Sequence, residues 1–246
     1  MRLVAQLTFP NTHRLGRSVP TSATRLKPSI PYSQLFLICC VFFMVGCAKK
    51  PIDPFAATHT VQSLISAHGM ISSKSDLDYF GALINRLAKP LEPKPKIQFT
   101  LLVSPEPFAA GVGSEYLVFS TGLVTTVQNE SELAFVLAHE LAHIFLKHAE
   151  NANEEDSEKN ELSADELGLR LLSFAGYNPQ SALDALRRLG SGHYDPSVNT
   201  THPTSAARIQ HLTKAVRILA MSQVPVVTES RTYRHIQERM ASVTGE

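Results

Sequence analysis

The sequence predicts a mostly helical α+β fold, and three observations support this. Apolar residues recur at helical spacing in several segments, most clearly over residues 60–89 and 129–149. Residues 97–103 and 116–119 are instead rich in β-branched and aromatic side chains, which is typical of strands. With 246 residues, 43% of them hydrophobic, the chain is long enough for one sizeable domain. We therefore expect a helical core with a small β-sheet.

The helical pattern also predicts where individual helices begin and end. We expect the first segment to divide near His68 and Gly69, with Ser75 capping its second helix. Asn129 and Glu132 have capping-box spacing and open the helix predicted over residues 129–149. A Pro/Gly-rich loop up to Gly113 is expected between the two strands, and a charged loop over residues 150–159. Further helices are expected over residues 160–174, 180–189 and 206–221, and residues 223–246 form a peripheral tail with a helical pattern.

The N-terminus has the pattern of a targeting segment. Residues 1–46 carry five basic and no acidic residues, and an apolar run over residues 35–45 leads directly into Gly46 and Cys47. The ending resembles the lipobox of bacterial lipoproteins, which implies a signal peptide over residues 1–46, a lipid anchor on Cys47 and a tether over residues 47–59. An uncleaved membrane anchor and an organellar transit peptide are the alternatives.

Charge and the residue after Cys47 bear on location and partners. Without the five basic residues of the first segment, 18 basic residues remain against 22 acidic ones. This mildly acidic body gives no reason to expect a nucleic-acid partner. Ala48 stands where an Asp would retain a lipoprotein of enteric bacteria in the inner membrane. By that resemblance, we expect an outer-membrane lipoprotein that faces the periplasm.

The segment His139-Glu-Leu-Ala-His143 is the motif that indicates chemistry. On a helix, positions i and i+4 share one face, so both imidazoles can reach one zinc ion. Zinc would lower the pKa of a bound water and polarise a scissile carbonyl, and Glu140 would act as general base. The alternatives are a chance match or an ordinary core histidine. The apolar residues on either side argue against both, because three ionisable groups on such a surface need a partner.

A third metal ligand is expected on the next helix. Glu161 can ligate the metal, and Asp165, one turn later, can accept the outer N–H of a ligating histidine. Without the preceding motif, a glutamate and an aspartate four residues apart are more typical of an exposed helical face. His148 is the local rival for the third position, but on a continuous helix it would rotate away from the ligand face. We expect His148 to be solvated.

These motifs resemble those of the HtpX/LoiP/BepA-type zinc metallopeptidases, which are related to the prenyl and mitochondrial Oma-type proteases. The resemblance also includes residues 108–123, the Gly176-Tyr-Asn-Pro179 segment, and the later His202-Pro203 and Arg208. It implies a gluzincin-like core with a small sheet beside the H-E-x-x-H helix and one zinc ion. It further implies that the strand at 116–119 pairs with an extended peptide substrate.

The same resemblance places His202 and Arg208 near the active-site cleft, where a cation could stabilise an oxyanion. A helix-start loop for His202 and a surface ion pair for Arg208 are the alternatives. The layout is that of small lipoprotein members such as LoiP and YcaL, with the peptidase domain over residues 60–222. We therefore expect a zinc endopeptidase acting on misfolded or envelope proteins. A weakly catalytic, metal-containing chaperone or assembly factor, and an organellar stress protease, are the alternatives.

Overall fold

The computed structural model describes residues 55–151, 157–190, 206–220 and 230–244. All of them belong to one compact unit, Ile52–Glu246. In chain order, the elements are α2 (Ala56–His68), α3 (Lys74–Ala88), β1 (Gln98–Leu102), β2 (Ala109–Val112), β3 (Tyr116–Ser120), α4 (Thr121–Thr126), α5 (Glu130–Phe145), a 3₁₀ turn (His148–Asn151), α6 (Ser157–Phe174), α7 (Gln180–Leu189), α8 (Ala206–Ala220) and α9 (Arg231–Thr244). The expected mostly helical α+β fold is confirmed. Among the described helices, none combines the length and apolarity needed to cross a membrane.

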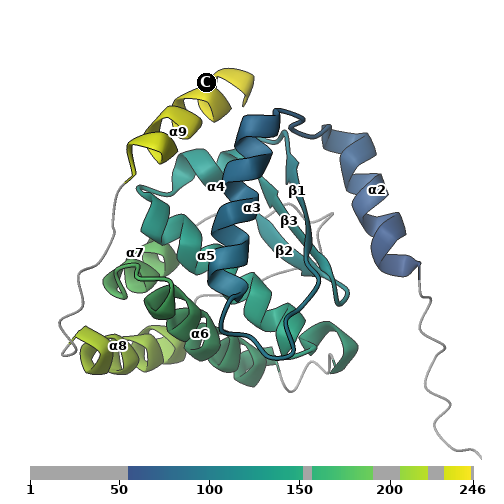
Figure 1. Cartoon of the computed structure of the whole chain (residues 1–246). Helices are drawn as coiled ribbons and strands as arrows, with labels where there is room; N and C mark the ends of the chain where they lie inside the picture. The colour runs from purple at the N-terminus through teal and green to yellow at the C-terminus, as the bar shows by residue number, and fades with distance from the viewer. Residues whose placement is uncertain (1–54, 152–156, 191–205, 221–229, 245–246) are drawn as a thin grey trace, which may run out of the picture. The chain divides into compact units, whose positions relative to one another are not determined.

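Helix α5 is the central element, and α3, α6, α7 and the sheet all pack against it (Figure 1). The predicted cap at its start is confirmed, because Asn129 Oδ1 accepts a hydrogen bond of 3.0 Å from the N–H of Glu132. The Glu132 carboxylate in turn accepts from the N–H of Gln128, one residue earlier than in an ordinary capping box. Burial on nearly every side explains why α5 is apolar around most of its circumference.

The sheet has the order β1-β3-β2, with β1 parallel and β2 antiparallel to β3. The expectation that residues 116–119 pair with a substrate is wrong, because β3 is the central strand and is paired on both sides. The outer edge of β1 is partly covered by residues 69–71, since the N–H of Ile71 donates to Leu101 O and that of Val103 to Gly69 O. In the described part of the chain, β2 therefore carries the open edge.

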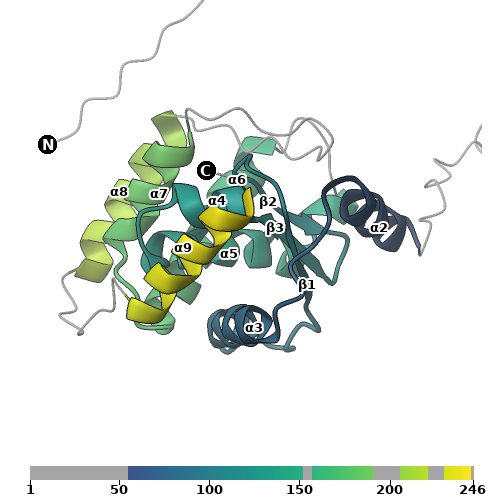
Figure 2. The same cartoon turned by 90° about the horizontal axis from the view of Figure 1, so that it is seen from above.

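The two faces of the sheet are covered by different helices, as Figures 1 and 2 show. Helix α2 covers one face, where Val61 and Leu64 pack with Leu102 and Val118. On the other face, the strands contribute Leu101, Leu117 and Phe119 to the main core, together with α3 and α5. This alternation along the strands is the pattern of a sheet buried on both faces.

Several element boundaries differ from expectation. Helix α2 begins at Ala56, α3 begins after Ser73 rather than at Ser75, and α6 already begins at Ser157. The expected end of α6 is confirmed, because Gly176 has a φ of +80°. Helix α9 is not peripheral: it buries one face against α4 in the main core, through Tyr233, Ile236 and Met240.

The largest local difference lies at the end of α5. The helix was expected to continue to about Ala149, but it ends at Phe145. Two residues later, Lys147 has a φ of +58°, in the left-handed region that a non-glycine residue adopts at some cost. The chain turns back on itself there and continues as the 3₁₀ turn that begins at His148.

Candidate active site

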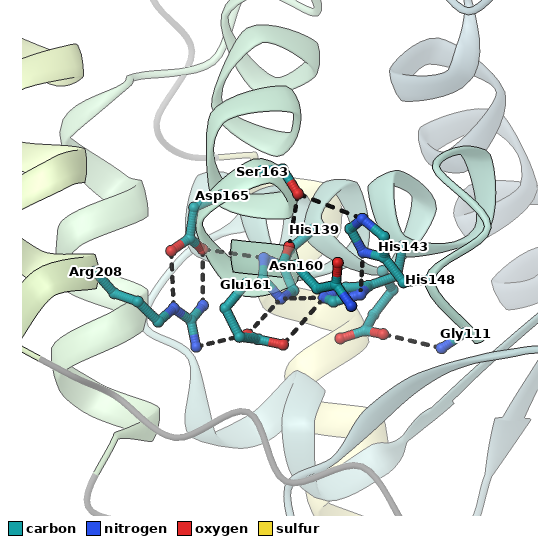
Figure 3. Close-up of polar contacts among 10 residues, drawn as sticks. Gly111, His139, His143, His148, Asn160, Glu161, Ser163, Asp165 and Arg208 are labelled. Atoms are coloured by element: carbon teal, nitrogen blue, oxygen red, sulfur yellow. Dashed lines mark hydrogen bonds and ion pairs between the residues drawn. The ribbon is translucent and has the colours of Figure 1, made fainter. Parts of the chain in front are cut away.

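Two helices bring the three predicted metal ligands together, and Figure 3 shows them. Helix α5 supplies His139 and His143, and α6 supplies Glu161. The two histidine Nε2 atoms lie 3.0 Å apart. Each Nε2 also lies 3.4 Å from an oxygen of Glu161.

These separations fit a tetrahedral metal centre. Zinc binds histidine nitrogen and carboxylate oxygen at about 2.0–2.2 Å, so two ligands of a tetrahedron lie about 3.3–3.5 Å apart. The two histidine nitrogens are close to this spacing, and each lies at it from a different oxygen of Glu161, so the three side chains are placed around one possible zinc position. Two histidines with one glutamate is also a known donor set of catalytic zinc sites.

Asp165 of α6 and Arg208 of α8 contact the candidate ligands. Nδ1 of His139 lies 3.0 Å from the carboxylate of Asp165. The Arg208 guanidinium donates twice to Asp165, at 2.8 and 2.7 Å, and its third nitrogen lies 2.9 Å from Glu161. Arg208 is 3% exposed, so the alternative of a surface ion pair is wrong. Its guanidinium thus contacts both Glu161, a candidate ligand, and Asp165, which lies behind the candidate ligand His139.

The charges of these buried groups favour a divalent cation. Glu140, Glu161 and Asp165 are buried carboxylates, and Arg208 is the buried cation among them. Two negative charges remain when both histidines are neutral, and burying uncompensated charge is costly. In the metal-free protein, burial opposes the charging of His139. Its contacts with Asp165 and Glu161 outweigh burial and raise the pKa of His139 to about 9. A bound zinc ion would replace that proton.

Glu140 projects from α5 toward the open edge of β2. Its Oε2 accepts a hydrogen bond of 2.9 Å from the N–H of Gly111. Gly111 has to be small, because a Cβ there would lie 2.8 Å from Ile144 and 3.2 Å from the carbonyl of Glu140. The edge strand and the candidate general base are thus in direct contact.

His148 is the site residue that sequence reasoning missed. It was expected to be solvated, but the turn at Lys147 brings its Nδ1 to 2.8 Å from Nδ1 of His143. Its Nε2 lies 3.3 Å from Oγ of Ser163 on α6 (Figure 3). Burial, together with the charge of His143, lowers the pKa of His148 to about 4. His148 lies off the ligand face, as expected, but it contacts His143 instead of being solvated, because α5 ends at Phe145 before it.

An apolar pocket adjoins the candidate ligands. His139, Glu140 and Arg208 are the charged or ionisable residues of its lining. The rest of its lining is largely aliphatic and aromatic: Phe108, Ala109, Leu123, Phe135, Val136, Ala185, Leu186 and Leu189. Helix α7 supplies the last three of these side chains, which the sequence did not connect with the site. Two predicted site residues, His202 and Cys47, lie outside the described residues.

The donor set, two histidines of an H-E-x-x-H helix and a glutamate of the next helix, is that of the H-E-x-x-H class of metallopeptidases. The chain belongs to peptidase family M48, whose sequence profile matches residues 78–156 and 152–216. It is also 32% identical over 87 residues to a protein of Vibrio cholerae serotype O1 with the provisional name beta-barrel assembly-enhancing protease. That alignment covers 35% of this chain and 18% of the relative, so the chain spans a small part of the relative's length.

Proposed function

We propose that the protein is a zinc-dependent endopeptidase. The observation that carries this proposal is the spacing of the donor atoms of His139, His143 and Glu161, at 3.0 and 3.4 Å, next to Glu140. Bound zinc would activate a water molecule and polarise the scissile carbonyl. Glu140 takes the proton from that water and later passes it to the leaving amine.

The open edge of β2 is the proposed docking strand for the substrate. The N–H of Ser120 donates to Phe108 O, so residues 108, 110 and 112 direct their backbone groups toward β3. Ala109 and Gly111 then direct theirs outward, where the N–H of Gly111 donates to Glu140. An extended peptide can add to the other outward backbone groups of this edge by main-chain hydrogen bonds, which place its backbone next to the base.

The apolar pocket supports a preference for unfolded substrates. It takes one side chain of the docked peptide, and its lining by Phe135, Leu186 and Leu189 favours an apolar residue. Such residues are buried in folded proteins and exposed in misfolded ones. An endopeptidase with this pocket acts preferentially on chains that have failed to fold.

The envelope is the proposed location. The basic segment, apolar run and Gly46-Cys47 ending support a lipoprotein signal, with Cys47 lipidated and the protein held at the outer membrane facing the periplasm. The name of the Vibrio relative, which refers to beta-barrel assembly, supports unfolded envelope proteins as substrates.

Cleavage of casein and of an unfolded outer-membrane protein by the purified full chain tests this function. We compare wild type with Glu140→Gln and with a chelated sample, and measure bound zinc in each. Wild-type cleavage that falls at least about 100-fold in Glu140→Gln, with zinc retained, is the expected result. Zinc binding without cleavage in any sample would contradict the peptidase and favour the chaperone or assembly factor.

A further inference from the structure

The outer nitrogen of His143 begins a chain of polar contacts that leads away from the ligand face. Nδ1 of His143 lies 2.8 Å from Nδ1 of His148, and Nε2 of His148 lies 3.3 Å from Oγ of Ser163. The Ser163 hydroxyl donates to the backbone carbonyl of Asn160 at 3.0 Å. Figure 3 shows these residues in sequence, from α5 through the 3₁₀ turn to α6.

The backbone carbonyl of Asn160 ends this series of contacts, and it determines which ring nitrogen of His148 and of His143 carries the proton. A backbone carbonyl can only accept, so the Ser163 hydroxyl has to donate to it. Its oxygen is then the acceptor for His148, which donates from Nε2 and has a bare Nδ1. That Nδ1 accepts from Nδ1–H of His143. Neutral His143 is thereby left with a bare Nε2, which is the nitrogen that faces His139 and Glu161.

The backbone before His148 also suits this residue to the role. The left-handed Lys147 carries the chain back toward α5, and non-glycine residues in that region are uncommon. The backbone strain at Lys147 accompanies the placement of His148 against the ligand.

We propose that His148 and Ser163 are positioning residues that hold His143 in the tautomer and orientation that zinc requires. His139 receives the same support from Asp165, whose carboxylate lies 3.0 Å from its outer nitrogen. His143 has the neutral His148 instead, anchored on α6. This inference rests on the proposed zinc site and adds two residues to it. Losing an outer partner of this kind costs about 10–100-fold in metal affinity.

Zinc affinity of the full chain, measured by competition with a chelating dye, tests the proposal. His148→Phe should weaken zinc binding by about 10–100-fold, and His148→Asn should recover part of the loss because its amide oxygen can accept near the position of Nδ1. Ser163→Ala should weaken binding less. His235→Phe, which replaces an exposed histidine on α9, is the matched control and should bind as wild type does.

Nitrogen NMR of the metal-free proteins separates positioning from general destabilisation. Wild-type His143 should carry its proton on Nδ1, and His148→Phe should lose that preference while its melting temperature stays close to that of wild type. Wild-type affinity in His148→Phe, or an unchanged His143 tautomer, would overturn the inference. Failure of the wild type to bind zinc more tightly than His139→Ala would instead overturn the proposed function.

Discussion

Each histidine that faces the candidate metal site is held from behind by a different residue. Asp165, itself fixed by Arg208, lies behind His139, and His148 lies behind His143. Burial alone would raise the pKa of Asp165, but Arg208 and His139 keep it below its ordinary value. His139 has a charged partner, Asp165, whereas His143 has a neutral one, His148. This difference limits the negative charge that is buried around the metal site.

A second group of buried polar residues lies away from the site and supports α5. Glu130, in the first turn of α5, accepts a hydrogen bond from the hydroxyl of Tyr177, which follows α6. Burial raises the pKa of Tyr177, Tyr79 and Tyr233, and the nearby carboxylate of Glu130 raises all three further. These phenols remain neutral in the folded protein well above pH 10.

This arrangement predicts a loss of stability at alkaline pH. A tyrosine whose pKa is higher in the folded state ionises first in the unfolded state, near pH 10. Its stabilisation is therefore fully present below pH 10 and declines above it, by up to about 1.4 kcal/mol per pH unit for each phenol. Tyr177→Phe should lower stability by about 1–3 kcal/mol at neutral pH, because Glu130 loses a buried donor.

Denaturant unfolding of Tyr177→Phe between pH 8 and 11 measures both the loss of stability and its dependence on pH. The decline above pH 10 should be shallower than in wild type, since one ionisable phenol is gone. Equal slopes for Tyr177→Phe and wild type would contradict the role assigned to Tyr177.

Among the elements, the contact between α5 and α6 determines the geometry of the ligands. Gly168 on α6 lies directly against His139, and a Cβ there would approach the backbone N and Cα of His139 to 3.1 Å. Because both neighbours are backbone atoms of a buried helix, neither can move without shifting a candidate ligand.

Gly168→Ala should therefore separate the two helices. We expect a loss of about 1–3 kcal/mol in stability and weaker zinc binding, although alanine is the better helix former. Gly81→Ala on α3 is the matched control, because its Cβ would meet only the Phe99 ring at an ordinary 3.5 Å. Thermal unfolding and zinc titration of both variants provide the comparison. Equal stabilisation by the two substitutions would show that the close approach at Gly168 has no cost.

The helices were more predictable than the strands and the turn. The pattern from Asn129 to His143 combines a cap, a helical period and ligands at i and i+4, so it predicts both the helix and its ligand face. Strand β2 could not be predicted in the same way. Its residues, Ala-Ala-Gly-Val, are small because α5 lies against them, and small residues have little strand propensity.

His148 escaped prediction for a different reason. Its position depends on the single left-handed residue Lys147, and lysine is not a residue that signals such a conformation. Glu161 and Asp165 were assigned from their spacing after the first motif, and the structure places both beside His139. Arg208 was assigned only by resemblance, because its ion pairs with α6 depend on how α8 packs against α6.

For the molecule as a whole, the candidate metal site joins the two central helices. Two donors come from α5 and one from α6, so a metal that binds the folded state adds its binding free energy to stability. At a free zinc concentration 1,000-fold above the dissociation constant, that addition is about 4 kcal/mol. Removing the metal should therefore lower the melting temperature of the whole unit.

Elemental analysis of bound zinc in the purified full chain, together with the melting temperature before and after chelation, tests the zinc site assigned to His139, His143 and Glu161. We expect about one zinc per wild-type chain and a melting temperature that falls on chelation. Glu161→Gln replaces the ligand from α6 by a side chain of the same shape. This variant should retain little zinc, and its melting temperature should change little on chelation. A wild-type chain without zinc, or a Glu161→Gln chain that binds it equally well, would contradict the assignment.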